Sequence, residues 1–229
     1  MFESDPPAHA VPLLQPASEA SESAKPTSIS RVALYRASIF TLISLLSPLS
    51  FGICLGFSNP ALESLSDELD LSKKQKSLFG SGLTLGAIVG AAAGTILPDL
   101  IGRASAIALS MSPMIAAFGF LYRAKTAAVA IASRFVSGTG VGLASLVSAI
   151  YIIEIAPPQI RGMLGSCNQL AVTTGISTIY IVGYFLTSFR SLCFVAIIPS
   201  SLLFVIIACG ILPETPRHLL GKGRIESAR

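Results

Sequence analysis

Apolar and polar residues follow one another in long blocks along this chain, rather than at the short period of a soluble helix or strand. Six long apolar runs are separated by linkers that carry most of the charged residues. Each run is long enough to cross about 30 Å of hydrocarbon at 1.5 Å per residue. The pattern predicts an all-α membrane protein with six transmembrane helices, over residues 37–57, 78–97, 104–122, 127–153, 164–186 and 192–212.

The composition supports this interpretation. Of the 229 residues, 52% are hydrophobic and only 12% are charged, whereas a soluble domain usually has about 25% charged residues. So few charges cannot cover a water-soluble surface, and we expect an integral, multi-pass membrane protein whose partner is the lipid bilayer. The net charge of +4 comes without a basic run interleaved with aromatics, so no nucleic-acid partner is expected.

Three regions are predicted. Residues 1–36 are rich in Ser, Pro, Ala and Glu and are expected to form a disordered cytosolic tail, since no apolar period organises them. Residues 37–212 form the six-helix bundle, and residues 213–229 lie beyond it. The excess of Lys and Arg places both ends of the chain in the cytosol and Lys73 on the far side. The sequence leaves open whether the membrane is the plasma membrane or an endomembrane such as that of a vacuole or lysosome.

Residues with catalytic or metal-binding chemistry are sparse. The four cysteines lie in apolar runs without CxxC spacing, and the two histidines lie in the tail and a linker. No Ser/His/Asp set and no pattern of metal ligands is present. We therefore expect no enzyme activity, no metal and no cofactor.

The second apolar run carries a glycine at every fourth position, Gly82, Gly86, Gly90 and Gly94. This spacing puts a groove without side chains along one helix face, which a neighbouring backbone can approach closely. The groove serves either static packing or the sliding of one helix along another.

Acid–base clusters with glycine or proline close the second, fourth and sixth apolar runs. In the predicted topology all three lie on the cytosolic side, where charge-assisted bonds can lock helix ends together. The alternative is that the arginines anchor the helices among lipid headgroups. We call this set the latch: Asp99, Gly102, Arg103, Glu154, Arg161, Glu214 and Arg217.

Four segments carry a resemblance to a known family. They are Arg134 with its following glycines, YIIEIAPPQIRG from Tyr151, GSCNQLAVTTGI from Gly165, and PETPR from Pro213. In this order they resemble the N-terminal half of a sugar porter of the major facilitator superfamily. SFGICLGFSNPAL, from Ser50, is most similar to the branch of early-dehydration-type and intracellular hexose carriers.

The resemblance implies twelve helices in two halves that rock around a central sugar site. This chain would supply the first half, residues 213–229 would begin the central cytosolic loop, and a C-terminal six-helix half or partner chain would complete the carrier. The implied substrate is a monosaccharide or related sugar, moved by alternating access. The latch residues match the family's cytosolic latch.

The resemblance also assigns the sugar site. Gln169 matches a sugar-contacting glutamine of the fifth helix, and Val172, Thr173 and Ile176 match the wall beside it. An amide can donate to and accept from sugar hydroxyls in an otherwise apolar wall. The alternative is a glutamine bonded to a neighbouring helix.

One departure concerns proton coupling. Proton-coupled members of the family pair an aspartate of the first helix with the arginine that matches Arg134, and here Cys54 stands at the aspartate position. A thiol, with an ordinary pKa of about 8.5, cannot run the protonation cycle of an aspartate at neutral pH. We therefore expect facilitative transport, unless the coupling group lies in the missing half. The alternative function is a truncated, non-transporting relative that senses sugar or modifies a full carrier.

Overall fold

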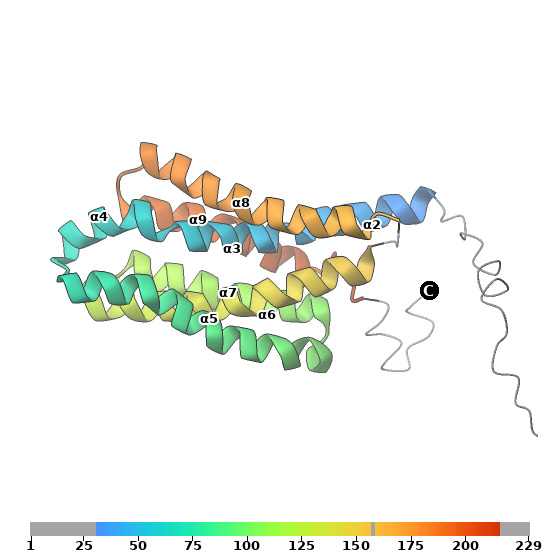
Figure 1. Ribbon diagram of the computed structural model, residues 1–229, viewed down its shortest axis with the longest axis horizontal. Helices are drawn as coiled ribbons and strands as arrows, with labels where there is room; N and C mark the ends of the chain where they lie inside the picture. The colour runs from blue at the N-terminus through green and yellow to red at the C-terminus, as the bar shows by residue number, and fades with distance from the viewer. Residues whose placement is uncertain (1–30, 157–158, 216–229) are drawn as a thin grey trace, which may run out of the picture.

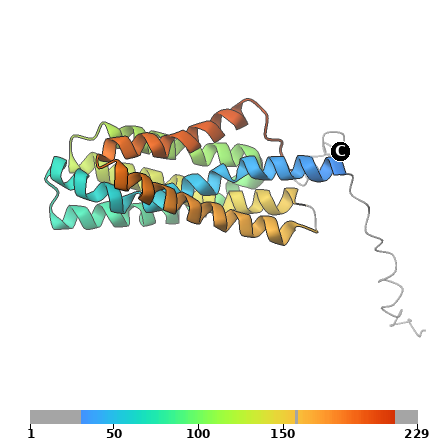
Figure 2. The same ribbon diagram turned by 90° about the horizontal axis from the view of Figure 1, so that it is seen from above.

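The computed structural model describes residues 31–156 and 159–215, and over them the regular structure is entirely α-helical. The helices run side by side along the long axis (Figures 1 and 2), which confirms the predicted fold class. Their bounds are α2 Arg31–Ser44, α3 Leu46–Gly56, α4 Ser58–Leu69, α5 Lys73–Ile101, α6 Arg103–Tyr122, α7 Ala127–Ile155, α8 Arg161–Phe185 and α9 Phe189–Ala208.

The first span agrees with the predicted range 37–57, since the helical segment Ser38–Gly56 is long and apolar enough to cross a membrane, but the helix extends beyond the span at both ends. Helical structure begins at Arg31, inside the stretch assigned to the tail, and continues to Leu69 with only short interruptions. The N–H groups of Leu45 and Phe57 each bond to the carbonyl four residues earlier, at 3.0 Å. Helix geometry therefore persists through α2, α3 and α4.

The extension α4 is amphipathic, which explains why the chain stays helical beyond the end of the predicted span. Ala61 and Leu65 are fully buried, while Glu63 and Asp67 point outward from the other side of the same helix. A charged segment can remain helical when one face still packs. The helix ends at Asp70, the one residue other than glycine with a positive φ among those described, at 49°.

The other five predicted spans agree with α5 to α9 within a few residues at most ends. Over the described residues, five helical segments are long and apolar enough to cross a membrane. The helix α8 is not among them, although its 25 residues suffice in length. Its polar residues, which include Gln169, Thr173 and Ser177, lower its hydropathy.

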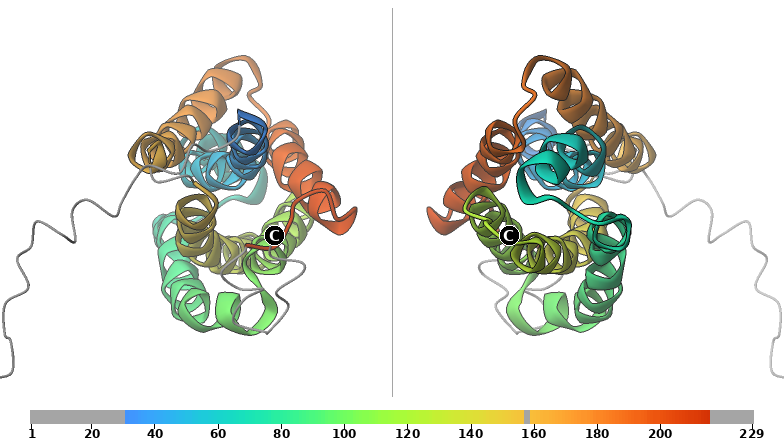
Figure 3. Two further views of the ribbon diagram at one scale, coloured as in Figure 1. Left: turned by 90° about the vertical axis from the view of Figure 1, so that its right-hand side faces the viewer. Right: turned by 90° about the vertical axis from the view of Figure 1, so that its left-hand side faces the viewer.

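Glycines bring two pairs of helices into backbone contact. A Cβ added to Gly90 of α5 would lie 2.0 Å from the carbonyl oxygen of Thr139 on α7. On the other pair, a Cβ added to Gly52 of α3 would lie 2.0 Å from the carbonyl oxygen of Val172 on α8. The predicted glycine groove of the second span is thus filled by α7. In the end-on views of Figure 3, α6 and α9 lie next to each other.

The bundle has two ends, which we name by residues. The Arg103 end holds the turns after α5 and α7, and the Glu68 end holds the turn after α4.

Single cysteines at Lys74 and Gly162, in a background without the native cysteines, should react with an impermeant reagent from opposite sides of the membrane. Both sites suit labelling, since Lys74 is exposed and a Cβ at Gly162 meets no atom within 4 Å. Labelling of both from one side would contradict the predicted topology.

Candidate functional site

Arg134 of α7 is buried in the middle of the bundle, with 1% of its surface exposed. Its Nη1 and Nη2 each donate to the carbonyl oxygen of Cys54 on α3 at 3.3 Å, and Nη2 also donates to the hydroxyl of Ser58. The guanidinium lies over two aromatic rings, 5.2 Å from the centroid of Phe79 and 5.7 Å from that of Phe57. Backbone, hydroxyl and ring faces thus replace a carboxylate partner.

Within the described part of the chain, no carboxylate forms an ion pair with Arg134. The thiol of Cys54 lies 3.9 Å from Nη1, at the position the sequence singled out. Ser58 and Phe79 were not predicted, because they lie far from Arg134 in the sequence.

The latch centres on Arg103 at the N-terminus of α6. Its Nε lies 3.1 Å from Oε2 of Glu154 on α7, and its Nη2 lies 2.8 Å from Oδ1 of Asp99 on α5. The Arg103 and Glu154 side chains are only 12% and 8% exposed, whereas that of Asp99 is 72% exposed. One cation therefore joins the ends of α5, α6 and α7, and its contact with Glu154 is the protected one.

Glu214 does not pair with an arginine within the described residues. Its carboxylate accepts from the backbone N–H groups of Ala104 and Ser105, at 3.2 and 3.1 Å, and from the Ser105 hydroxyl at 2.9 Å. The carboxylate thus caps the positive end of α6, where the N-cap residue Gly102 has no side chain. Gly102 has a φ of 102°, and a Cβ there would lie 2.6 Å from the Glu214 carboxylate. The positive φ requires glycine, and a Cβ there would also displace the carboxylate from the helix end.

Two further residues hold the segment after α9 against α7. The Tyr151 hydroxyl donates to the carbonyl oxygen of Pro213 at 3.0 Å, and the Thr215 hydroxyl donates to Oε2 of Glu154 at 2.6 Å. Thr215 is fully buried. Sequence reasoning missed both, although Tyr151 lies three residues before Glu154 and hence on the same helix face.

The remaining latch residues are less connected. Arg161 is exposed, and its Nη2 donates to the carbonyl oxygen of Ala156 at 3.5 Å. Arg217 lies outside the described residues. The structure therefore brings together Asp99, Arg103 and Glu154, places Gly102 and Glu214 beside them, and leaves Arg161 apart.

The predicted sugar-site residues of α8 divide between two environments. Gln169 and Thr173 are exposed, and the Thr173 hydroxyl donates to the carbonyl oxygen of Leu170 at 2.9 Å. Val172 is 4% exposed and packs against α3. Ile176 is half-buried and faces Gly56 of α3. Only the first two lie on a face that a solute can reach in this chain.

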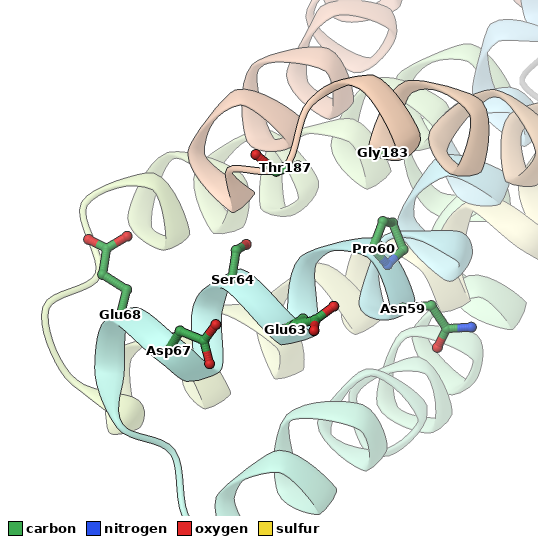
Figure 4. Close-up of a pocket in the computed structure, with 8 residues that line it drawn as sticks. All are labelled: Asn59, Pro60, Glu63, Ser64, Asp67, Glu68, Gly183 and Thr187. Carbon is green, nitrogen blue, oxygen red and sulfur yellow. The ribbon is translucent and has the colours of Figure 1, made fainter.

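Two pockets open on the bundle, one beside Cys54 and one at the Glu68 end. A groove of about 370 Å³ is lined by α3, α5 and α7, including Phe51 and Leu55 on either side of Cys54, with the hydroxyls of Thr84 and Ser145. A second pocket, of about 690 Å³, lies at the Glu68 end between α4 and the end of α8. Figure 4 shows Glu63, Asp67 and Glu68 along α4 in this pocket, with Gly183 and Thr187 from α8 and its following turn. Gly183 is about 21 Å along α8 from Gln169, so the acidic pocket is separate from the predicted sugar site.

The chain is similar to known sugar transporters over most of its length. The family model described as "Sugar (and other) transporter" matches residues 23–229. The solute carrier family 2, facilitated glucose transporter member 8 of Bos taurus is 39% identical over 187 residues, covering 80% of this chain and 38% of that protein. The sugar transporter ERD6-like 8 of Arabidopsis thaliana is 35% identical over 198 residues, covering 86% of this chain and 41% of that protein.

Solved structures of a xylose transporter share the fold of this chain. The partially occluded, inward-open xylose transporter XylE of E. coli superposes with a TM-score of 0.76 at 26% identity, covering 84% of this chain and 53% of that one. A second XylE structure, described as a proton:xylose symporter bound to 6-bromo-6-deoxy-D-glucose, gives a TM-score of 0.73 at 27% identity. It covers 85% of this chain and 48% of that one. The chain thus spans about two fifths of its curated relatives and about half of these solved carriers.

Proposed function

Because this chain belongs to the sugar transporter family, we propose that it supplies the N-terminal six-helix half of a carrier that moves a monosaccharide across a membrane. It is an integral, multi-pass membrane protein of the major facilitator superfamily. The proposed substrate is a hexose-like sugar, as the names of its glucose-transporter and sugar-transporter relatives suggest. The proposed mechanism is alternating access, in which this half rocks against a C-terminal half.

The observation that carries the proposal is the exposed polar stripe of α8. Gln169, Thr173 and Ser177 are spaced by four residues and are all exposed, on a helix that lies in a membrane bundle. Polar side chains facing hydrocarbon are costly, whereas the same groups facing a water-filled cavity are not. Amide and hydroxyl groups in a row suit a ligand made of hydroxyls. A second half placed against this face would enclose such a cavity at the interface of the halves.

The residues at the Arg103 end are proposed to hold this half in one conformation. Arg103 joins the ends of three helices through Asp99 and Glu154, and Glu214 ties the segment after α9 to the start of α6. Loosening these contacts would free the helix ends to move relative to one another. Residues 213–229 would then begin the linker to the second half, and residues 1–36 would precede the bundle as a cytosolic tail.

The transport is proposed to be facilitative. Arg134 is satisfied by the Cys54 carbonyl, the Ser58 hydroxyl and two aromatic rings. None of these groups gains or loses a proton near neutral pH, so this site offers no protonation step to drive uptake. A relative whose name includes "facilitated glucose transporter" is consistent with such a site.

Replacing Gln169 tests the sugar contact. In the complete carrier, Gln169→Ala should weaken sugar binding by about 1–3 kcal/mol, because a sugar hydroxyl loses its partner. Equilibrium binding of radiolabelled glucose to purified carrier measures the change. The matched control is Thr174→Ala, an exposed residue of the same helix that lies outside the stripe of residues 169, 173 and 177. Unchanged affinity for several sugars in a well-folded Gln169→Ala variant would remove this residue from the site.

A further inference from the structure

A groove of about 460 Å³ opens on the surface of the bundle between the second half of α6 and the first half of α9, near the Glu68 end. Along α6 it extends from Ala116 to Arg123, about 10 Å at 1.5 Å per residue. Its floor is hollow at Gly119, where an added Cβ would meet no atom within 4 Å. Phe194 and Ile197 of α9 form the opposite wall.

The groove is apolar along its length and positively charged at one end. Arg123, which lines it, is the exposed C-cap residue of α6. Lys125, two residues later, is also exposed. Within the described residues neither side chain takes part in an ion pair, and no acidic side chain lines the groove.

The surroundings of the groove have the composition of a lipid-facing surface. The span of α9 has the highest mean hydropathy of those described, 2.5, yet only 33% of it is buried. Tyr122 and Phe194 meet edge to face at the charged end, with centroids 4.8 Å apart. Aromatic rings beside a cation are typical of the membrane–water interface. This pattern predicts that the apolar part of the groove lies at hydrocarbon depth and that Arg123 lies at headgroup level.

We propose that this groove binds an anionic glycerophospholipid, with one acyl chain along Gly119 and the phosphate on Arg123. A guanidinium matches a phosphate group through paired N–H donors, and Lys125 adds a second positive charge that favours a headgroup with net negative charge. An apolar lining suits an acyl chain and offers nothing to a sugar. The site lies on helices other than the α8 stripe, so it does not depend on the proposed transport function.

The test compares lipid retention by the purified chain. The protein is extracted into detergent with equal amounts of phosphatidylglycerol and phosphatidylcholine, and native mass spectrometry counts the lipids that stay bound. Wild type should retain phosphatidylglycerol in preference to phosphatidylcholine. Arg123→Gln should lower phosphatidylglycerol retention by up to about fivefold, the effect expected of an exposed pair of opposite charges. Gly119→Leu should lower the retention of both lipids, because its side chain fills the groove.

Matched controls come from α5. Lys73→Gln removes an exposed cation from the same end of the bundle, and Gly80→Leu adds a side chain where a Cβ also meets nothing. Both should retain lipid as wild type does. Wild-type retention by Arg123→Gln, or an equal loss in Lys73→Gln, would overturn the headgroup site. An unaffected Gly119→Leu would overturn the groove as the place of the acyl chain. If Gly119→Leu does not fold, Gly119→Val tests the same point with a smaller side chain.

Discussion

Glu154→Gln should destabilise the bundle by about 3 kcal/mol, because it removes the protected partner of a nearly buried arginine. Breaking a buried ion pair by removing one member costs roughly 3–5 kcal/mol. We expect the lower end of that range, since Arg103 keeps its 2.8 Å contact with Asp99. The amide oxygen of the glutamine can still accept the hydrogen bond from the Thr215 hydroxyl. The loss of stability therefore reports the removed negative charge. Unfolding of the purified protein in mixed micelles with increasing denaturing detergent measures the change.

Double-mutant cycles test whether Glu154 interacts with Arg103 or with Arg161. Glu154→Gln combined with Arg103→Gln should be non-additive by about 2 kcal/mol, within the range for residues in contact. Glu154→Gln combined with Arg161→Gln should be additive within about 0.5 kcal/mol, because Arg161 contacts a backbone carbonyl instead. Additivity in the first cycle, or strong coupling in the second, would contradict the arrangement at the Arg103 end.

Gly90→Ala should have an effect of similar size through a different cause. The new Cβ would lie 2.0 Å from the Thr139 carbonyl oxygen, and backbone cannot give way as a flexible side chain can. Overpacking costs about 1–3 kcal/mol, and we expect the upper end because α5 and α7 must move apart. Thermal unfolding of the purified protein measures the loss.

Gly80→Ala on the same helix is the matched control. A Cβ there meets no atom within 4 Å, so alanine should instead stabilise the helix by about 0.5–1 kcal/mol. The two substitutions differ in the contact that the methyl group makes and are expected to differ in sign. A Gly90→Ala protein as stable as wild type would mean that the two backbones do not approach this closely.

The sequence predicted the elements of this fold well where hydropathy alone determines them. The ends of α6 and α7 agree with the predicted spans within two residues, because apolar runs there stop abruptly at charges. Hydropathy does not indicate α4, where acidic residues on one face conceal a helix whose other face packs. The span at α8 was predicted from its apolar run over 164–186 and agrees with the helix within three residues, although its polar stripe lowers its hydropathy.

The site was less predictable, because its contacts join residues far apart in the chain. Arg103 and Glu154 were each predicted as latch residues, yet their separation of 51 positions hides the pairing. Glu214 was expected to meet an arginine, and the chain path after α9 brings it instead to the bare N-terminus of α6. The acceptors of Arg134 include a backbone carbonyl, which no side-chain pattern can indicate.

The most direct test of the account uses the complete carrier in liposomes under an imposed pH gradient. Labelled glucose should enter only until its inside and outside concentrations are equal, whichever side is acidic, because no carboxylate among the described residues 31–156 and 159–215 pairs with Arg134. Accumulation of glucose above its outside concentration, persisting in a Cys54→Ser variant, would contradict facilitative transport and place the coupling group in the other half. The absence of any carrier-dependent glucose entry would contradict sugar transport itself and favour a sensing relative.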